Sequence, residues 1–395
     1  MTKPLDGLRV LDLTRVLAGP YATMMLADMG AEVIKIENPQ GGDDSRAFAP
    51  FKNKESAYFI SLNRSKKSVT LNLKNQKAKQ MLKDMVKQAD ILVENYKPGA
   101  MKKLGLDYEV LREINPRLIY AASSGFGQTG PYSSRPAYDL IVQGMGGLMS
   151  ITGFDAEHPV KVGSSVADIF VGIFTTIGIL AALESRRKTG RGQMVDVAML
   201  DCLVATLENA LARYECTGIS PVPIGNAHPS IAPFATLPTA NGFINVAVGN
   251  DVLWGRFCDI CNVSEIKEDA RFVDNRNRVA NWNELKPILE SVFHKKTTEE
   301  WMTLLGDAQI PVGPIYNIEQ VVNDPQIKAR EMIVNMEHPI AGSMRVPGFP
   351  IKFSDTPAGI SSVAPLLGEH TAEIFGKYLS LSEEQIASLK EEGVL

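Results

Sequence analysis

The chain has 395 residues, enough for two domains that each bury a hydrophobic core. Apolar residues make up 45% and charged residues 22%, as is typical of a soluble globular protein. The net charge of −4 is unlike that of nucleic-acid-binding proteins, and four cysteines cannot form a disulfide framework. We therefore expect a cytoplasmic protein that binds no nucleic acid.

Neither a signal peptide nor a membrane span is predicted. The first residues, MTKPLDGLRVLDL, carry no apolar core ahead of a small-residue cleavage site. The longest apolar stretch, residues 169–183, is too short to cross a bilayer and contains two glycines, which favours a buried helix. We expect no membrane among the partners.

Strand and helix patterns alternate through the first half of the chain. Residues 8–37 predict a β-α-β unit, with LRVLDL and AEVIKIE as strands and Gly19-Pro20 opening the helix. The following segments predict a helix at 76–90, a strand at ILVEN, a helix at 108–115, a strand at LIYAASS and a helix at 168–187. This alternation predicts an α/β fold with a Rossmann-like, mostly parallel sheet that helices cover on both faces.

The second half of the chain changes character. Residues 201–217 predict a helix, the proline-rich segment 221–234 predicts a long loop, and Asn241-Gly242 predicts a hairpin. Helices dominate residues 252–307, with capping-box spacing at Thr297-x-x-Glu300. MRVPG and PIKFS then predict strands, followed by two short polar helices.

These patterns predict a large domain and a smaller α+β domain. The predicted boundaries are the N-terminal part of the large domain at 1–200, a linker at 201–225, the small domain at 226–320, and a linker with a return to the large domain at 321–395.

A glycine motif at Gly125-x-Gly127-x-x-Gly130 has the spacing of a dinucleotide-binding fingerprint and follows a predicted strand. PYSS comes next, where that fingerprint needs a helix to receive the pyrophosphate, so a glycine-rich turn is favoured. Glu37 ends the second strand, where an NAD enzyme keeps its ribose-binding acid, but the RVLAGP turn lacks the required glycines. The sequence therefore disfavours an NAD dehydrogenase and leaves open a nucleotide-like ligand at this sheet edge.

Metal and hydrolase motifs have little support. Cys258-x-x-Cys261 has no second cysteine pair nearby, so a packed helix face is favoured over metal or redox chemistry. The five histidines show no ligand spacing, and neither G-x-S-x-G nor H-E-x-x-H occurs.

Asp168 is the only charged residue between Lys161 and Glu184. Its spacing from Ser165 is that of a capping box, in which a carboxylate stabilises the start of a helix. A carboxylate at a helix start also stays ionised and exposed at one end, as a nucleophile must. The residues alone leave both interpretations open.

Several segments occur together in the order of a known family: LDGLRVLDLTRVLAGP, GAEVIKIE, VENYKPG, SGFGQTGP, AYDL, VGSSVADIFVGIFTTIGILAALESRRKTGRGQ and IPVGPI. Along nearly its whole length the chain resembles the class III CoA-transferases, the superfamily of formyl-CoA transferase, carnitine CoA-transferase and α-methylacyl-CoA racemase. The resemblance implies a large domain built from both chain ends with a small domain between them. It also implies an interlocked homodimer, in which each subunit is threaded through its partner.

The resemblance also assigns site residues. The aspartate of the family's VADI-type motif is the nucleophile, and here it is Asp168. Active-site or CoA-contact positions match Val16, Leu17, Ala18, Asn95, Tyr138 and, where the family has a basic residue, Asn38. Lys74, Lys103 and Arg191 are candidates for pairing with the CoA phosphates, although each alone fits a solvated surface charge better.

The implied reaction moves CoA from an acyl-CoA to a free carboxylic acid through an aspartyl anhydride and an aspartyl-CoA thioester. CoA is then a substrate, with no resident cofactor and no metal. The GNAHPSIAPF loop resembles that of relatives using small dicarboxylates such as succinyl-CoA, and Leu17 replaces a glutamine of the formyl-CoA enzymes, which weakens the case for oxalate. The loop 221–234 is either a lid that keeps water off the anhydride or an ordinary loop.

Two other functions are alternatives that the sequence favours less. An α-methylacyl-CoA racemase needs two opposed acid/base groups, and racemases place a histidine where this chain has Tyr138, a poor base near neutral pH. A non-catalytic CoA-binding paralogue is disfavoured because the Asp168 motif is intact.

Overall fold

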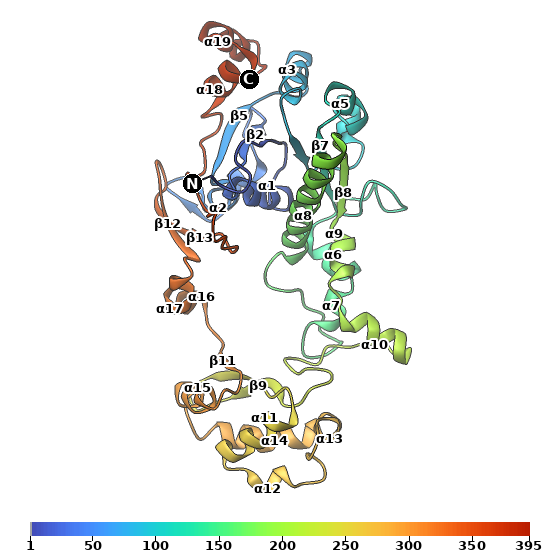
Figure 1. The fold of residues 1–395 in the computed structure, drawn as a ribbon, viewed down its shortest axis with the longest axis vertical. Helices are drawn as coiled ribbons and strands as arrows, with labels where there is room; N and C mark the ends of the chain where they lie inside the picture. The colour runs from blue at the N-terminus through green and yellow to red at the C-terminus, as the bar shows by residue number, and fades with distance from the viewer. Residues whose placement is uncertain (1) are drawn as a thin grey trace. The chain divides into compact units, whose positions relative to one another are not determined.

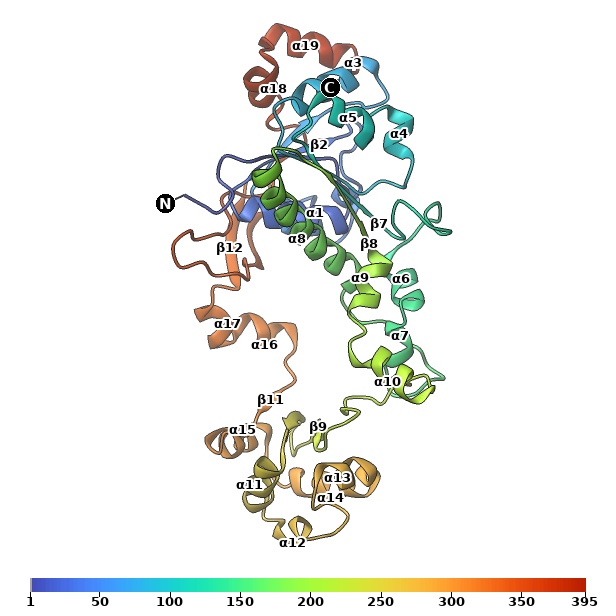
Figure 2. The same ribbon diagram turned by 45° about the vertical axis from the view of Figure 1, so that its right-hand side comes forward.

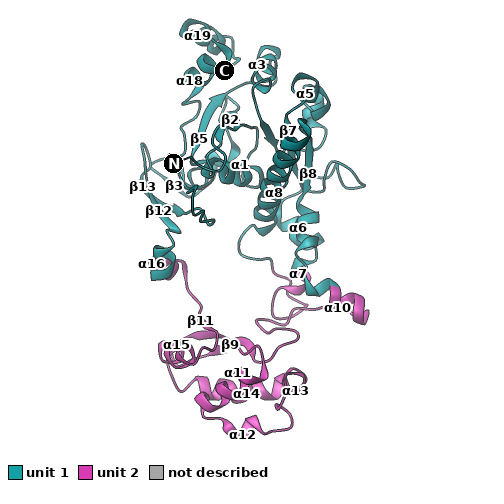
Figure 3. Ribbon diagram, viewed as in Figure 1, with its two compact units in different colours: residues 1–148, 161–211, 325–395 teal, residues 149–160, 212–324 magenta. Residues whose placement is uncertain are grey.

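The computed structural model describes residues 2–395, which form two compact units (Figure 3). Unit 1 comprises residues 1–148, 161–211 and 325–395, and unit 2 comprises residues 149–160 and 212–324. Each unit has its own buried hydrophobic clusters.

Unit 1 contains a six-stranded parallel sheet in the order β5-β2-β1-β6-β7-β8. The strands are β1 (Arg9–Asp12), β2 (Glu32–Glu37), β5 (Lys66–Thr70), β6 (Ile91–Glu94), β7 (Ile119–Ser124) and β8 (Met194–Ala198). Counted along the chain within this sheet, the order is 3-2-1-4-5-6, that of a Rossmann-type sheet. The predicted α/β fold with a parallel sheet is confirmed. Ligands of such sheets bind beyond the carboxyl ends of the strands where the order reverses, which here lies between β1 and β6.

Helices cover both faces of this sheet (Figures 1 and 2). The helices α1 (Ala18–Asp28) and α8 (Val166–Thr189) lie side by side on one face, and α3 (Gln76–Val86), α5 (Tyr108–Ile114) and α18 (Thr371–Leu379) cover the other. Successive residues of β1 enter opposite cores: Val10 packs with α1 and α8, and Leu11 packs with α3 and α18. A strand buried on both faces must be continuously apolar, which explains the LRVLDL run.

Shorter elements complete unit 1 and the connections to unit 2. They are η1 (Asp44–Ala47), β3 (Phe51–Lys52), β4 (Glu55–Ser56), α2 (Ala57–Asn63), α4 (Ala100–Leu104), α6 (Asp139–Met145), α7 (Leu148–Ile151), α9 (Met199–Ala205), α10 (Asn209–Thr217), α16 (Ile318–Asn323), α17 (Pro325–Ala329), β12 (Ile333–His338), β13 (Gly342–Pro347) and α19 (Glu383–Glu391). The two predicted helices near the C-terminus are thus present as α18 and α19.

Unit 2 is a small α+β body. An antiparallel sheet of order β11-β10-β9 packs with helices around stacked aromatic rings. Besides α16 and most of α7 and α10, its elements are β9 (Phe234–Pro238), β10 (Phe243–Ala247), α11 (Asp251–Cys261), α12 (Ser264–Lys267), α13 (Asn275–Ala280), α14 (Trp282–Phe293), α15 (Thr298–Asp307) and β11 (Val312–Pro314).

Several predictions for unit 2 are confirmed. The hairpin turns at Asn241-Gly242 between β9 and β10, and α15 begins with the Thr297/Glu300 capping box. Cys258 and Cys261 are buried in the core on one face of α11, as a packed helix face requires.

Three local predictions were wrong, and one strand was not predicted. The PIKFS segment pairs with no strand, and its Ile351 and Phe353 side chains are exposed. The helix predicted at 201–217 is broken into α9 and α10, because Glu208 adopts a left-handed backbone conformation between them. Residues 194–198, just before α9, form the edge strand β8, which was not predicted. The Ser165/Asp168 capping box is also absent, as described below.

Within residues 2–395, α8 is the one helix that is long and apolar enough to cross a membrane by length and composition. One side of α8 packs on α1, β7 and β8, whereas Phe174 and Ile177 on its other side are exposed. The prediction of a buried helix therefore holds for one face only.

Candidate active site

The β1–α1 loop, residues 13–17, lies where the strand order of the sheet reverses. Asn95, just after β6, ties this loop down: its Oδ1 accepts from the Arg15 N–H at 2.8 Å and its Nδ2 donates to the Arg15 carbonyl at 2.8 Å. The fit is close at Gly19, where a Cβ would lie 2.4 Å from Thr14 and 3.2 Å from Asn95. Glycine in the RVLAGP segment therefore lets helix and loop approach each other.

Helix α1 begins beside this loop with free amide groups. Leu17 is its N-cap and offers no side-chain acceptor, and the N–H groups of Ala18 and Gly19 have no partner within the helix, whereas Pro20 has no N–H. Val16, just before, has φ of 67°, which is unusual for a β-branched residue. The amides and the helix dipole together make this end of α1 suitable for binding a negatively charged oxygen.

Asp168 lies next to the start of α1 because α8 and α1 pack closely. A Cβ on Gly172 would lie 2.9 Å from the Ala18 carbonyl oxygen, so only glycine allows this approach. Asp168 precedes Gly172 by one helical turn and is therefore on the same side of α8. It lines one cavity with the loop residues Val16 and Leu17.

That cavity has a volume of about 300 Å³ and opens at the carboxyl ends of β1, β6 and β7. Its walls come entirely from unit 1. The lining residues are Arg15, Val16, Leu17, Ala18, Asp44, Asn95, Tyr96, Lys97, Pro98, Ser123, Ser124, Gly125, Arg135, Pro136, Ala137, Tyr138, Asp168 and Met199.

The start of α8 is capped by Asp139 of α6. Asp139 Oδ1 accepts from the Ala167 N–H at 3.0 Å, and its Oδ2 accepts from Gln143 at 2.7 Å. Ser165 makes no side-chain capping bond, so the predicted Ser165/Asp168 capping box is wrong. The Asp139 carboxylate caps α8 in place of Ser165, and the Asp168 side chain lines the cavity.

Asp168 has an unusual environment for a carboxyl group. Burial, and secondarily the nearby Asp139 carboxylate, raise the pKa of Asp168 to about 7. Its ionised form is poorly solvated, which favours reaction with an electrophile in the cavity. Tyr58 of α2 responds to the same charges: burial and then the charges of Asp168 and Asp43 raise its pKa to about 12.

Comparisons with known proteins identify the family of the chain. The model of CoA-transferase family III matches residues 5–371. The chain belongs to this family. It is 43% identical to the succinate–glutarate CoA-transferase of Agrobacterium fabrum over 95% of each chain, and 44% identical to the acetyl-CoA:oxalate CoA-transferase of Acetobacter aceti over 89% of each. A crystal structure of a CAIB/BAIF family protein from Brucella suis is 40% identical and superposes with a TM-score of 0.86, covering 96% of this chain and all of that one.

The family resemblance expected from the sequence is thus confirmed, and the protein is a CoA-transferase, an enzyme whose substrates are CoA thioesters. Of the ten site residues expected from the sequence, six line the one cavity: Val16, Leu17, Ala18, Asn95, Tyr138 and Asp168. The other four are exposed and do not line it: Asn38, Lys74, Lys103 and Arg191.

Three cations that line the cavity of this CoA-transferase were not predicted from the sequence: Arg15, Lys97 and Arg135. Arg15 pairs with Asp44 at 3.1 Å, Arg135 lies over the Tyr132 ring at 4.0 Å, and Lys97 follows Asn95 in the loop after β6. All three lie in or beside the family segments: Arg15 and Lys97 closely follow β1 and β6, and Arg135 lies in the segment between β7 and α6. A Rossmann-type sheet binds its ligand beyond these carboxyl ends of its strands. Their position relative to these strands, rather than their residue type, could have identified them from the sequence.

Among residues 2–395, no group of His, Cys, Asp and Glu side chains is arranged to hold a metal ion.

Proposed function

We propose that this family III CoA-transferase moves CoA from an acyl-CoA to a small dicarboxylic acid, with Asp168 as the nucleophile. One observation carries the proposal: Asp168, with its raised pKa, and the start of α1, with the amides of Leu17 and Ala18, line the same cavity. An electrophilic carbonyl between them would meet a nucleophile on one side and donors for its developing negative charge on the other.

The first half of the reaction consumes the acyl-CoA donor. The Asp168 carboxylate attacks the thioester carbonyl, and the C–S bond breaks, so that the CoA thiolate leaves with the electron pair and a mixed anhydride remains. The thiolate then attacks the aspartyl carbonyl of the anhydride and releases the donor acid as a carboxylate. The product is an aspartyl-CoA thioester, and no proton is gained or lost. Amides near Leu17 and Ala18 stabilise the oxyanion at each addition.

The second half reverses these steps with the acceptor. The acceptor carboxylate attacks the aspartyl-CoA carbonyl and expels the thiolate, giving a new anhydride. The thiolate attacks the acceptor's acyl carbon, which releases the new acyl-CoA and restores the Asp168 carboxylate. Both covalent intermediates are activated acyl groups, so neither step stalls in a deep energy well.

Dicarboxylic acids are the substrate class that we favour. The relatives named above are CoA-transferases of succinate and glutarate and of oxalate, at 43% and 44% identity. The cations Arg15, Lys97 and Arg135 line the cavity and can pair with a second carboxylate that does not react. Asn38, Lys74, Lys103 and Arg191 lie outside the cavity, and we keep them as candidate contacts for the distant CoA phosphates.

We further propose that the enzyme works as an interlocked homodimer in the cytoplasm. The exposed apolar side of α8, with Phe174 and Ile177, supports a second copy as its cover. Both interpretations of the loop 221–234, as a lid over the anhydride or as an ordinary loop, stay predictions. The state of assembly is tested by light scattering, in which a monomer would contradict this part of the proposal.

The test of the nucleophile uses Asp168→Ala with Asp201→Ala as control. Asp201 is also in the first turn of its helix, α9, but is exposed and lies outside the cavity. Wild type and Asp201→Ala are expected to exchange CoA between succinyl-CoA and glutarate, whereas Asp168→Ala should show no exchange and still bind CoA. Hydroxylamine added during turnover should trap an adduct on Asp168 that mass spectrometry detects. An active Asp168→Ala enzyme would contradict the proposed nucleophile.

A further inference from the structure

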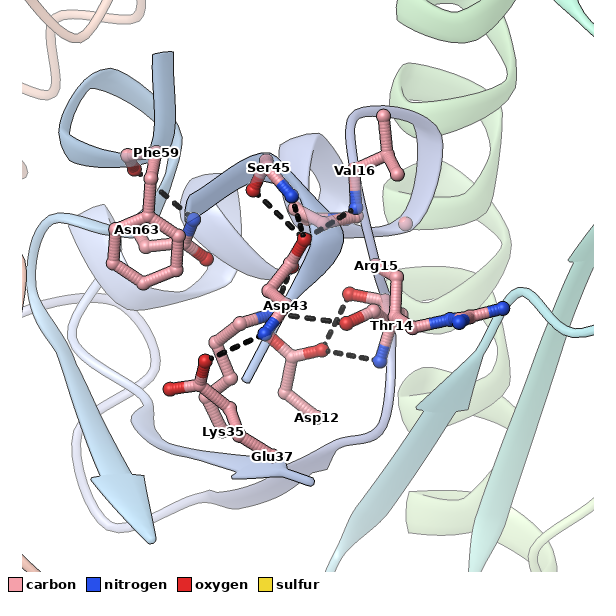
Figure 4. Close-up of polar contacts among 12 residues, drawn as sticks. Asp12, Thr14, Arg15, Val16, Lys35, Glu37, Asp43, Ser45, Phe59 and Asn63 are labelled. Carbon is pink, nitrogen blue, oxygen red and sulfur yellow. Dashed lines mark hydrogen bonds and ion pairs between the residues drawn. The ribbon is translucent and has the colours of Figure 1, made fainter. Parts of the chain in front are cut away.

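Beneath the β1–α1 loop lies a cluster of fully buried charges (Figure 4). Lys35 Nζ lies 2.8 Å from Asp43 Oδ2, and Lys66 Nζ lies 3.1 Å from Asp12 Oδ2, with all four side chains inaccessible to solvent. Burying two ion pairs is expensive, because the loss of hydration can exceed their mutual attraction. A buried cluster of this kind contributes little to the net stability of the fold. The residues that it contacts indicate a more specific role.

The cluster bonds to the backbone of the β1–α1 loop at three points. Asp12 Oδ1 accepts from the Thr14 N–H at 2.9 Å, and Lys35 Nζ donates to the Thr14 carbonyl at 2.8 Å. Asp43 Oδ1 accepts from the Val16 N–H at 3.0 Å. The charged side chains therefore hold the backbone on both sides of Arg15, at the entrance to α1.

Val16 is the residue that most needs this support. Its φ of 67° is rare for a β-branched side chain and persists only where the surroundings over-determine it. Relaxation of Val16 would change the direction in which the chain enters α1 and would move the amides of Leu17 and Ala18 relative to Asp168.

Asp43 is itself firmly held. Its Oδ1 also accepts from the N–H and hydroxyl of Ser45, and its own N–H donates to Glu37 at 3.0 Å. Glu37 in turn is paired with Arg46 at 2.7 Å. Burial opposes ionisation of Asp43, but the adjacent Lys35 and these hydrogen bonds hold its pKa below the usual value. The chain of contacts thus runs from strand β2 through a charged Asp43 to Val16.

We propose that the buried Lys35–Asp43 pair is a positioning device for catalysis: it fixes the backbone of Thr14 to Val16 so that the first amides of α1 point at the carbonyl attacked by Asp168. Neither residue lines the cavity, so both act through the loop. This inference rests on the proposed function.

The test compares two buried acid–base pairs at opposite ends of α1. Asp43→Asn keeps an acceptor for Val16 but sets an amide against Lys35, whereas Asp28→Asn weakens the equally buried Asp28–Arg64 pair, which does not touch the loop. Both variants should lose thermal stability. Asp43→Asn should lower kcat about 100-fold, as misplaced catalytic groups do, with a change of at most about threefold in KM for the acyl-CoA. Asp28→Asn should leave kcat within about twofold of wild type.

A second comparison asks whether the effect runs through Val16. Glycine adopts a φ of 67° without strain, so in a Val16→Gly background the further loss caused by Asp43→Asn should be smaller than in wild type. Equal losses in both backgrounds, or equal kcat values for Asp43→Asn and Asp28→Asn, would overturn the positioning role.

Ser45→Ala covers the case in which Asp43→Asn does not fold. It removes one hydrogen bond to Asp43 and no charge, and it should lower kcat about fivefold in the same direction. A Ser45→Ala enzyme with wild-type kcat would then overturn the role. If wild type transfers CoA and only these variants fail to behave as expected, the positioning inference falls alone. If wild type shows no transfer, or Asp168→Ala is active, the proposed function falls.

Discussion

Two helices of this protein begin with the same sequence spacing and do so in different ways. Helix α15 in unit 2 starts at Thr297-x-x-Glu300, and both reciprocal hydrogen bonds of a capping box are made. Helix α8 in unit 1 starts at Ser165-x-x-Asp168, but Ser165 makes no capping bond. The Ala167 N–H donates instead to Asp139 of helix α6. The first start is built from its own residues for stability. At the second, an outside carboxylate supplies the cap, and the residue in the Glu300 position is free to react.

The contrast predicts that Asp168, which does not cap its helix and is buried beside Asp139, destabilises the folded protein when it is ionised. Its folded pKa of about 7 lies above the ordinary pKa of an aspartate, 3.8, so its contribution to stability is fully present below pH 4 and is lost as the pH rises through 7. At pH 8, Asp168→Asn should therefore unfold at a higher temperature than wild type. Its free energy of unfolding should exceed that of wild type by at most about 4 kcal/mol. Thermal unfolding measured from pH 4 to pH 8 tests this, since the gap between variant and wild type should widen with pH. A constant gap would contradict it.

Removal of the outside cap should affect catalysis more than an ordinary cap does. Asp139→Ala leaves the Ala167 amide without its acceptor and loosens the first turn of α8, where Asp168 lies. We expect kcat to fall about 100-fold, because a small displacement of the nucleophile is enough for this. Steady-state kinetics with saturating acyl-CoA measure it. Asp139→Asn, which keeps an oxygen for Ala167, should retain much more activity, and equal losses in the two variants would count against the capping role.

The raised pKa of Asp168 should also appear in the pH dependence of transfer. The nucleophile must be ionised, so kcat/KM should fall about tenfold for each pH unit below 7 and level off above it. Asp139→Asn removes the like charge that contributes to the shift, so the acid limb of its profile should move to lower pH. Profiles of both enzymes with the same donor and acceptor make the comparison. An unchanged limb in the variant would show that Asp139 does not act on Asp168 electrostatically.

How far the sequence predicts these features depends on how local their causes are. The first β-α-β unit, the Asn241-Gly242 hairpin and the Thr297 capping box follow from residues adjacent in the chain, and they are present. The cap of α8 depends on Asp139, which lies 28 residues before Ala167, so no local pattern shows it. PIKFS has the residues of a strand, but a strand exists only with a partner, and none pairs with it.

The candidate site follows the same rule. Asp168 stands out in the sequence because it is the one charge in a long apolar run, and the family resemblance gives it a role. The Lys35–Asp43 pair could not be found in this way, because nothing along the chain shows that Asp43 reaches Val16. The β1–α1 loop, the buried pair that holds it and the cavity cations come from separate parts of the chain. Only the folded sheet brings them together as one site.

The smallest predicted effect compares the two N-cap residues directly. Thr297→Ala removes a hydroxyl that accepts from the Glu300 N–H, and it should lower the stability of unit 2 by about 1 kcal/mol. Ser165→Ala removes a hydroxyl that makes no capping bond, so the loss should be within about 0.5 kcal/mol, the range of ordinary surface substitutions. Chemical denaturation of both variants measures the difference, and neither change should alter kcat. If Ser165→Ala were as destabilising as Thr297→Ala, Ser165 would be capping α8 after all, and the separation between a self-capped helix and one capped by Asp139 would not hold.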